Sequence, residues 1–260
     1  MAMLRYKIYA ESNRISFEKP VLVLLHGFGG GYANWYGQIR ALKRDYDLLL
    51  IELPSHGKSP VKLSELENSY ESVVREILRV LDHLGIEKAH FGGLSMGTMF
   101  VKYMALHYPQ RVDKYILAGP IGEFDLLLRG LLNLVRCLLH FVPLNWLIKV
   151  VTAVLMPHRV SKSGRELFVA TAKRLSQKEY AAWLQLLTKY QNIQNAYRQA
   201  MGDEANALYL VGELDHFFLP MLKKERKTAK NFVLLEDAGH VCVTDQAELA
   251  NQQILAFLNG

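Results

Sequence analysis

Short aliphatic runs alternate along the chain with longer segments in which apolar residues recur every three or four positions. The amphipathic segments are Ser69–Leu84, Thr98–Tyr108 and Gln246–Leu258, and this spacing predicts helices. The aliphatic runs are typical of buried parallel strands. They are Val21–Leu25, Leu48–Leu53, Ala89–Leu94, Tyr115–Ala118, Ala207–Val211 and Phe232–Leu235. The alternation predicts an α/β fold with a doubly wound, mostly parallel sheet, to which the alternating residues 3–11 add a half-buried strand.

The strand–helix rhythm stops between about residues 121 and 201, where the sequence predicts only helices. We therefore expect a core domain made of residues 1–120 and 202–260, with residues 121–201 inserted as a helical cap. The first part of the cap is very apolar, but its longest uncharged run, Cys137–Ile148, is shorter than the ~20 residues that a membrane span needs. We expect no stable membrane insertion. Cap helices that roof a cavity are the favoured interpretation, and helices that lie on a membrane surface are the alternative.

The composition fits a packed globular protein, since half of the 260 residues are hydrophobic and 22% are charged. The formal net charge of +6 raises the question of an anionic partner. The most basic run, residues 223–227, is interrupted by Glu225 and resembles a solvated helix face, and no nucleic-acid-binding motif accompanies it. We therefore expect no nucleic-acid partner.

Two cysteines, Cys137 and Cys242, lie far apart and show no spacing typical of a metal site. A disulfide framework is therefore not expected, and neither is a metal. Because the first residues also lack the pattern of a signal peptide, we expect a cytoplasmic location. The sequence leaves the oligomeric state open.

The segment Gly93-Leu94-Ser95-Met96-Gly97 places a serine between a predicted strand and a predicted helix. In this strand–turn–helix setting a G-x-S-x-G motif lifts the hydroxyl above the edge of the sheet. Gly93 and Gly97 fit because the tight turn leaves no room for larger side chains. The motif predicts Ser95 as a nucleophile and the Met96 amide as an oxyanion donor at a helix N-terminus.

A serine nucleophile needs a base, and histidine is the side chain best suited to this role near neutral pH. His240 follows the last predicted strand in the segment Asp237-Ala238-Gly239-His240, where a loop can carry it over the serine. Asp215 follows the preceding strand and is the predicted acid that orients His240, with Glu213 as its rival. The order Ser95, Asp215, His240 matches the chain order of α/β-hydrolases.

A glycine-rich loop, His26-Gly27-Phe28-Gly29-Gly30-Gly31, follows the first aliphatic strand. Its spacing fits neither a phosphate-binding loop nor the dinucleotide fingerprint. We expect the Phe28 amide to be the second oxyanion donor, with Gly27 in the same turn and His26 anchoring the loop by hydrogen bonds.

Taken together, these segments resemble the α/β-hydrolase family, in its single-domain group of esterases, thioesterases, acylglycerol lipases, lactonases and C–C bond hydrolases. The resemblance also rests on the segment from Leu53 to Ser59. Here and at the residue before it, the chain departs from the usual family pattern, with Glu52 and Ser55. It covers the chain except for the cap. It implies a reaction without metal or organic cofactor, and the serine in the elbow argues against relatives that use an aspartate nucleophile.

The predicted function is cleavage of a small-molecule carboxylic ester through an acyl-enzyme on Ser95, with the leucine-rich segment Leu126–Leu155 lining an apolar pocket. The alternatives are a thioesterase, or a C–C bond hydrolase or lyase-like enzyme acting on acidic substrates. The acidic-substrate alternative calls for basic residues facing the pocket, for which Arg129, Arg136 and Arg159 are the candidates. A binding protein that has lost the chemistry is the alternative outside the enzymes.

Overall fold

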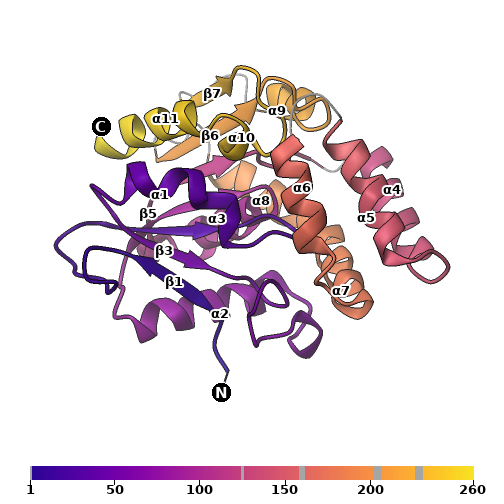
Figure 1. Cartoon of the computed structure of the whole chain (residues 1–260), viewed down its shortest axis with the longest axis horizontal. Coiled ribbons are helices and arrows are strands. Elements are labelled where there is room, and N and C mark those ends of the chain that lie inside the picture. Colours follow the sequence, from indigo (N-terminus) through magenta and orange to yellow (C-terminus); the bar gives the residue numbers. More distant parts are fainter. Residues whose placement is uncertain (1, 124–125, 158–161, 202–205, 226–230) are drawn as a thin grey trace.

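One sheet of seven strands forms the centre of the computed structural model, which describes residues 2–123, 126–157, 162–201, 206–225 and 231–260 (Figure 1). The strand order is β1-β3-β2-β4-β5-β6-β7. Only β1 runs antiparallel, paired with β3, and the other neighbours are parallel. The strands are β1 (Tyr6–Tyr9), β2 (Val21–Leu25), β3 (Asp47–Ile51), β4 (Ala89–Leu94), β5 (Val112–Ala118), β6 (Ala207–Gly212) and β7 (Phe232–Leu235).

The central strands are buried on both faces, which explains why they read as continuous aliphatic runs. Every residue of β2, β3, β4 and β6 is buried, as expected for parallel strands covered by helices on both sides. The predicted doubly wound, mostly parallel α/β sheet is therefore confirmed. The third strand ends two residues earlier than predicted, because the Leu53 amide donates to His26 Nε2 at 3.0 Å instead of joining the sheet.

The core helices form two groups around the sheet. Helices α1 (Tyr36–Leu42) and α11 (Ala247–Asn259) pack together, and α3 (Met96–His107) packs against α2 (Tyr70–His83) in a second group. Ser69 caps α2 by accepting a hydrogen bond from the Ser72 amide. Two short helices, α9 (Leu219–Glu225) and α10 (Cys242–Asp245), flank the loops that carry Asp215 and His240.

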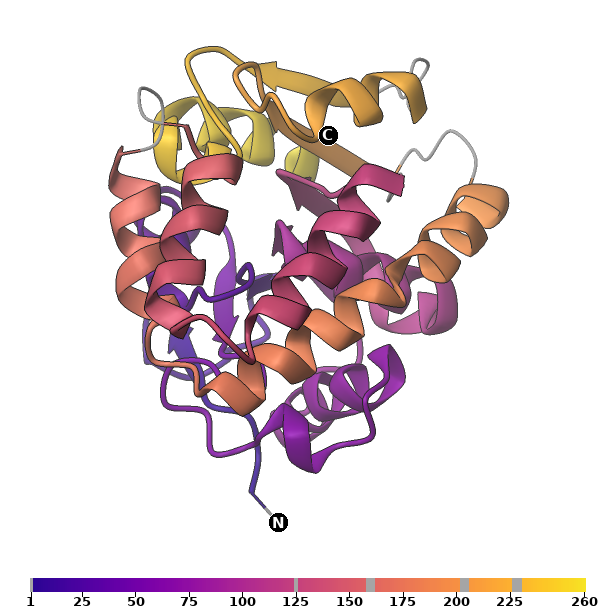
Figure 2. The same ribbon diagram turned by 90° about the vertical axis from the view of Figure 1, so that its right-hand side faces the viewer.

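In the described part of the chain, five helices lie between β5 and β6 and form the cap-like part that faces the viewer in Figure 2. Within the described ranges this insert contains helices and no strand, as predicted. They are α4 (Leu126–Leu138), α5 (Leu144–Leu155), α6 (Lys162–Ala172), α7 (Gln177–Thr188) and α8 (Tyr190–Met201). The last one returns to the core, where Lys102 of α3 donates to the Tyr190 hydroxyl and the Gln194 carbonyl. The domain boundaries at residues 120 and 202 stay a prediction.

A buried carboxylate on the cap helix α7 connects it to the loop after β3. The hydroxyls of Ser55 and Ser64 both donate to Glu179, and the Ser64 amide donates at 3.2 Å. Burial alone raises the pKa of Glu179, but these hydrogen bonds outweigh it, so the pKa lies below its usual value. Ser55, one of the two departures from the family pattern, therefore holds the cap against the core.

Candidate active site

Ser95 occupies a strained turn between β4 and α3. Its backbone has φ 51° and ψ −116°, a sparsely populated region that costs about 1–3 kcal/mol for a residue other than glycine. Two backbone hydrogen bonds hold the turn, from the Ser95 amide to Ala118 O at 2.8 Å and from the Thr98 amide to Ser95 O at 2.9 Å. The turn places the hydroxyl at the carboxyl edge of the sheet, next to the N-terminus of α3.

The predicted glycines of the turn lie where no side chain fits. A Cβ on Gly93 would lie 2.6 Å from the Gly97 carbonyl carbon, and a Cβ on Gly97 would lie 2.5 Å from Leu25 O. Both obstacles are backbone atoms, which cannot move aside without displacing the strand or the helix. Gly93 and Gly97 therefore permit the close approach of β4, α3 and the loop after β2.

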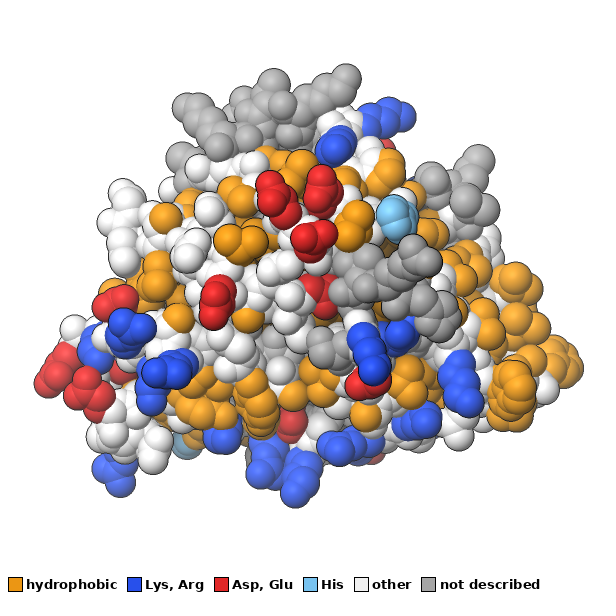
Figure 3. All heavy atoms as spheres, turned by 45° about the horizontal axis from the view of Figure 1, so that its top comes forward, with side chains coloured by type: hydrophobic (Ala, Val, Ile, Leu, Met, Phe, Trp, Pro, Cys, Tyr) orange, Lys and Arg blue, Asp and Glu red, His pale blue; other side chains and the backbone are white. Residues whose placement is uncertain are grey.

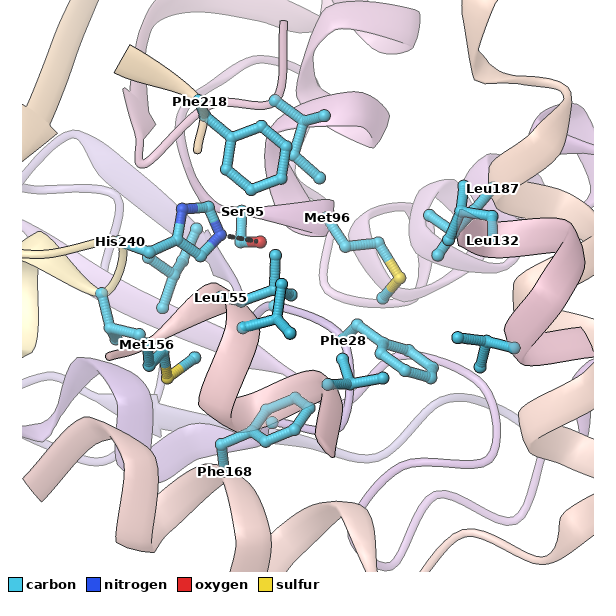
Figure 4. Close-up of a pocket in the computed structure, with 18 of the residues that line it drawn as sticks. Phe28, Ser95, Met96, Leu132, Leu155, Met156, Phe168, Leu187, Phe218 and His240 are labelled. Atoms are coloured by element: carbon cyan, nitrogen blue, oxygen red, sulfur yellow. Dashed lines mark hydrogen bonds between the residues drawn. The ribbon is translucent and has the colours of Figure 1, made fainter. Parts of the chain in front are cut away.

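The structure brings Ser95, His240 and Asp215 together in a hydrogen-bonded chain. Ser95 Oγ lies 2.8 Å from His240 Nε2, and His240 Nδ1 lies 2.8 Å from Asp215 Oδ2 (Figure 4 draws the first of these contacts). Because an ionised Asp215 can only accept, Nδ1 carries the proton and Nε2 is free to accept from the serine hydroxyl. The Phe218 ring packs against the imidazole, with ring centroids 4.7 Å apart.

Asp215 is buried, and its charge is compensated inside the site. Burial raises its pKa, but the neighbouring His240 and the Phe218 amide, which donates to Oδ1 at 3.0 Å, lower it below its usual value. The carboxylate therefore stays ionised at neutral pH. Its rival Glu213 is exposed to solvent, so the contact with His240 belongs to Asp215.

Two buried histidines hold the glycine-rich loop after β2. His26 accepts from the Leu53 amide at Nε2 and donates from Nδ1 to Gly27 O at 2.8 Å. His56 accepts from the Gly29 amide at 2.9 Å and donates from Nδ1 to Pro54 O. Each ring must be neutral to accept at Nε2, so the loop geometry depends on uncharged histidines.

These histidines predict a loss of stability in acid. Burial is the main cause that lowers the pKa of His26 to about 4 and that of His56 well below its usual value. Histidine in the unfolded chain titrates at about pH 6.5, so between this pH and pH 4 the unfolded chain binds more protons than the folded protein. The contribution of these histidines to the free energy of unfolding is therefore fully present above pH 6.5. As the pH falls below this value the free energy of unfolding decreases, and His26 alone accounts for a decrease of about 3 kcal/mol at pH 4.

Denaturant unfolding over this pH range checks the expectation, with His26→Gln as the test variant and the exposed His83→Gln as the control. The glutamine amide can replace both hydrogen bonds without titrating, so His26→Gln should flatten the pH dependence while His83→Gln should not. If the free energy of unfolding depended on pH equally in the wild type, His26→Gln and His83→Gln, the role of His26 in the acid sensitivity would be contradicted.

The Phe28 and Met96 amides are the predicted oxyanion donors, and both residues line the same cavity as Ser95. Among the described residues, no backbone carbonyl accepts a hydrogen bond from either amide. Met96 is the first residue of α3, where the helix dipole favours negative charge. Gly27 also lines the cavity, beside Ser95.

An apolar cavity of about 1140 Å³, its mouth included, lies between Ser95 and the cap helices (Figure 4). Phe28 forms part of its wall and packs against Tyr180 of α7, with ring centroids 4.8 Å apart. No lysine, arginine, aspartate or glutamate lines it among the described residues. As predicted, α4 and α5 line it with aliphatic side chains, which include Leu128, Leu131, Leu132, Val135 and Leu155.

The basic residues that an acidic substrate calls for do not line this cavity in the described part of the chain. Arg129 and Arg136 are exposed on α4, and Arg159 lies outside the described residues. Nor do the described ranges hold any group of three histidine, cysteine, aspartate or glutamate side chains arranged to bind a metal ion.

Comparisons with known proteins bear on the fold. Residues 20–137 match the family model described as alpha/beta hydrolase fold. The crystal structure of the enol-lactonase from Burkholderia xenovorans LB400 superposes with a TM-score of 0.79 at 18% identity, covering 99% of this chain and 96% of that one. The chain has the α/β-hydrolase fold.

Two curated relatives show how far the sequence similarity extends. The dihydrolipoyllysine-residue acetyltransferase component of the acetoin cleaving system from Pseudomonas putida is 28% identical over 253 residues, which cover 91% of this chain and 63% of that protein. A 2-hydroxy-6-oxononadienedioate/2-hydroxy-6-oxononatrienedioate hydrolase from Comamonas testosteroni is 37% identical over 109 residues, covering 40% of this chain and 38% of that protein. The chain thus spans less than two thirds of the length of either relative.

The roles of His56 and Glu179 are not among the features predicted from the sequence. His56 holds the Gly29 amide across the loop, and Glu179 binds the loop after β3. The segment from Leu53 to Ser59 offered a signal for His56, because a buried loop at the sheet edge must pair its polar groups with neighbours. Nothing local marked Glu179, whose partners lie more than a hundred residues away in sequence.

Proposed function

We propose that the protein is a serine hydrolase that cleaves a carboxylic ester whose acyl or alcohol part is apolar. The observation that carries the proposal is the 2.8 Å contact between Ser95 Oγ and His240 Nε2 at the floor of an apolar cavity. A hydroxyl becomes a useful nucleophile when an oriented base takes its proton.

In the first half of the reaction Ser95 Oγ attacks the ester carbonyl carbon while His240 Nε2 takes the hydroxyl proton. Asp215 stabilises the imidazolium through Nδ1. The carbonyl oxygen becomes an oxyanion, for which the Phe28 and Met96 amides are the donors; one such donor contributes about 3 kcal/mol of barrier lowering in serine hydrolases. The tetrahedral intermediate collapses, the C–O bond to the alcohol breaks, and His240 returns the proton to the leaving oxygen.

In the second half a water molecule attacks the acyl-enzyme. His240 takes a proton from the water, the same amides hold the second oxyanion, and the bond to Ser95 Oγ breaks as the proton returns to the serine. The products are the acid and the free enzyme. Each step uses one proton carrier, a role that His240 can fill through its contact with Ser95.

The cavity favours an apolar ester over the acidic substrates of a C–C bond hydrolase. A carboxylate in this cavity would lose its hydration without gaining a cation, since no basic side chain among the described residues lines it. An acyl chain, in contrast, gains about 0.8 kcal/mol for each buried methylene, or roughly fourfold in affinity.

A chain-length series of p-nitrophenyl esters tests this proposal. We expect kcat/KM to rise with acyl length, by up to about fourfold per methylene, until the cavity is full. A 2-hydroxy-6-oxo-dienoate, the acidic C–C substrate type, should not be turned over. Leu132→Trp reduces the cavity and should move the optimum to shorter chains. Leu134→Trp is the matched control, because this residue lies on the same helix but faces solvent.

Turnover of the dienoate without ester hydrolysis would favour the C–C bond hydrolase instead. If a folded protein neither hydrolyses any ester nor reacts with a fluorophosphonate, the binding-protein alternative would replace both enzymatic ones.

A further inference from the structure

The hairpin of α4 and α5 exposes an unusual set of large apolar side chains, here called the hairpin surface: Leu134, Phe141, Trp146, Val150 and Val154. Phe141, in the turn between the helices, is 85% exposed, and Trp146 is 64% exposed. Most of the exposed large hydrophobic residues in the described part of the chain lie here. Large apolar side chains exposed together on two neighbouring elements of the chain indicate an interaction site.

The hairpin surface has an ordered arrangement. Trp146, Val150 and Val154 follow one another at four-residue intervals, so they form one stripe along α5. The opposite face of α5 is buried through Leu147 and Ile148. Figure 3 shows hydrophobic side chains gathered at the right-hand end of the molecule, over the end of the hairpin, with basic side chains beside them.

The charge of the segment indicates what kind of surface it meets. Between residues 126 and 165 the sequence contains six lysine and arginine residues and no aspartate or glutamate. This segment thus carries a formal charge of +6, the same as the net charge of the whole chain. Arg136 and Lys149 lie exposed on the hairpin, and the Lys149 ammonium lies 5.7 Å from the centre of the Trp146 ring. Aromatic and aliphatic side chains flanked by basic residues are typical of helices that lie in the interface of anionic bilayers.

The same surface borders the cavity of the candidate active site. Val150 and Val154 line the cavity and are also 56% and 45% exposed. The apolar wall of the cavity therefore continues onto the outer face of α5, with no charged side chain among the described residues that line it. A molecule dissolved in a lipid phase could reach the cavity along this wall without crossing water.

We infer that the α4–α5 hairpin docks the protein reversibly on lipid surfaces that carry anionic headgroups, with Phe141 and Trp146 in the interface. None of the helices within the described ranges is long and apolar enough to cross a membrane, so the contact is peripheral. A second copy of the chain fits this surface less well, because a two-fold interface would bring the basic residues of both hairpins together. This inference goes beyond the proposed ester hydrolysis, and binding to vesicles can be measured without any substrate turnover.

The tryptophan content makes the docking directly observable. The chain has three tryptophans, of which Trp35 and Trp183 are 1% and 0% exposed, so Trp146 alone can meet a lipid. With vesicles of phosphatidylcholine containing about one third phosphatidylglycerol, we expect co-sedimentation, a blue shift of the emission and quenching by brominated acyl chains. Pure phosphatidylcholine should bind more weakly, and high salt should reduce binding to the anionic vesicles.

Variants separate the apolar and the electrostatic contributions. Phe141→Ser combined with Trp146→Ser should lower the partition coefficient by at least about tenfold on both kinds of vesicle. Arg136→Gln and Lys149→Gln should each lower it about fivefold, and only on anionic vesicles. Phe17→Ser is the matched control, since Phe17 is 59% exposed and lies outside the hairpin. All these variants should keep the turnover of a short soluble ester.

Three results would overturn the inference: no co-sedimentation with anionic vesicles, binding that the Phe141 and Trp146 replacements leave unchanged, or a dimer in solution that these replacements dissociate. The last result would assign the surface to a second copy of the chain. Loss of ester hydrolysis with vesicle binding intact would count against the proposed function alone.

Discussion

Replacement of Ser95 by alanine is expected to lower kcat/KM for p-nitrophenyl esters by about 10,000-fold or more, with the protein still folded. The variant loses the one oxygen that lies 2.8 Å from His240 Nε2. It keeps the turn, because Thr98 and Ala118 hold Ser95 through backbone atoms. The free energy of unfolding should therefore change by no more than about 1 kcal/mol. Steady-state kinetics and denaturant unfolding measure the two quantities.

Covalent labelling tests Ser95 as the nucleophile without depending on the choice of ester substrate. A fluorophosphonate should attach to the wild-type protein at Ser95 and should leave the Ser95→Ala variant unlabelled. Ser59→Ala is the matched control, since Ser59 is a buried serine outside the hydrogen-bonded chain of His240 and Asp215. Undiminished hydrolysis by a folded Ser95→Ala variant would mean that the nucleophile is another residue.

The core could be predicted from the sequence because its signals are local. The runs Val21–Leu25, Ala89–Leu94 and Phe232–Leu235 coincide with β2, β4 and β7 at both ends, since polar residues, glycine or proline border each apolar run. The order and spacing of Ser95, Asp215 and His240 also follow from the chain, because parallel strands bring their carboxyl ends to one edge.

The arrangement of the cap could not be predicted in the same way. Helix α5 is apolar on more than one side, so the pattern alone does not say which face covers the cavity and which stays exposed. The Trp146 face of α5 is outward although it is as hydrophobic as the Leu147 face that is buried. Helix α8 returns to the core through hydrogen bonds from the buried Lys102 to Tyr190 and Gln194. The hydrophobic periodicity predicts that Lys102 lies on a helix, but it does not indicate these two partners. Such contacts arise only from tertiary packing.

Asp215→Asn is expected to lower kcat/KM by about 10,000-fold, by reversing the tautomer of His240. Asp215 accepts at both oxygens, from the Phe218 amide at Oδ1 and from His240 at Oδ2. An asparagine that keeps the first bond with its carbonyl oxygen turns its NH₂ group toward His240 Nδ1. That nitrogen must then accept, so the ring proton moves to Nε2, where it blocks acceptance from the Ser95 hydroxyl.

The loss should appear in kcat for a short ester and in the rate of fluorophosphonate labelling alike, because both reactions need the proton of Ser95 to leave. KM should change little, since Asp215 lies behind the imidazole and does not line the cavity. Glu213→Gln is the matched control: it removes an exposed carboxylate two residues away and should leave both rates unchanged. If Glu213→Gln abolished the reaction while Asp215→Asn did not, the acid would be Glu213. In that case the loop after β6 would have to change its conformation during the reaction, because of these two carboxylates it is Asp215 that contacts His240.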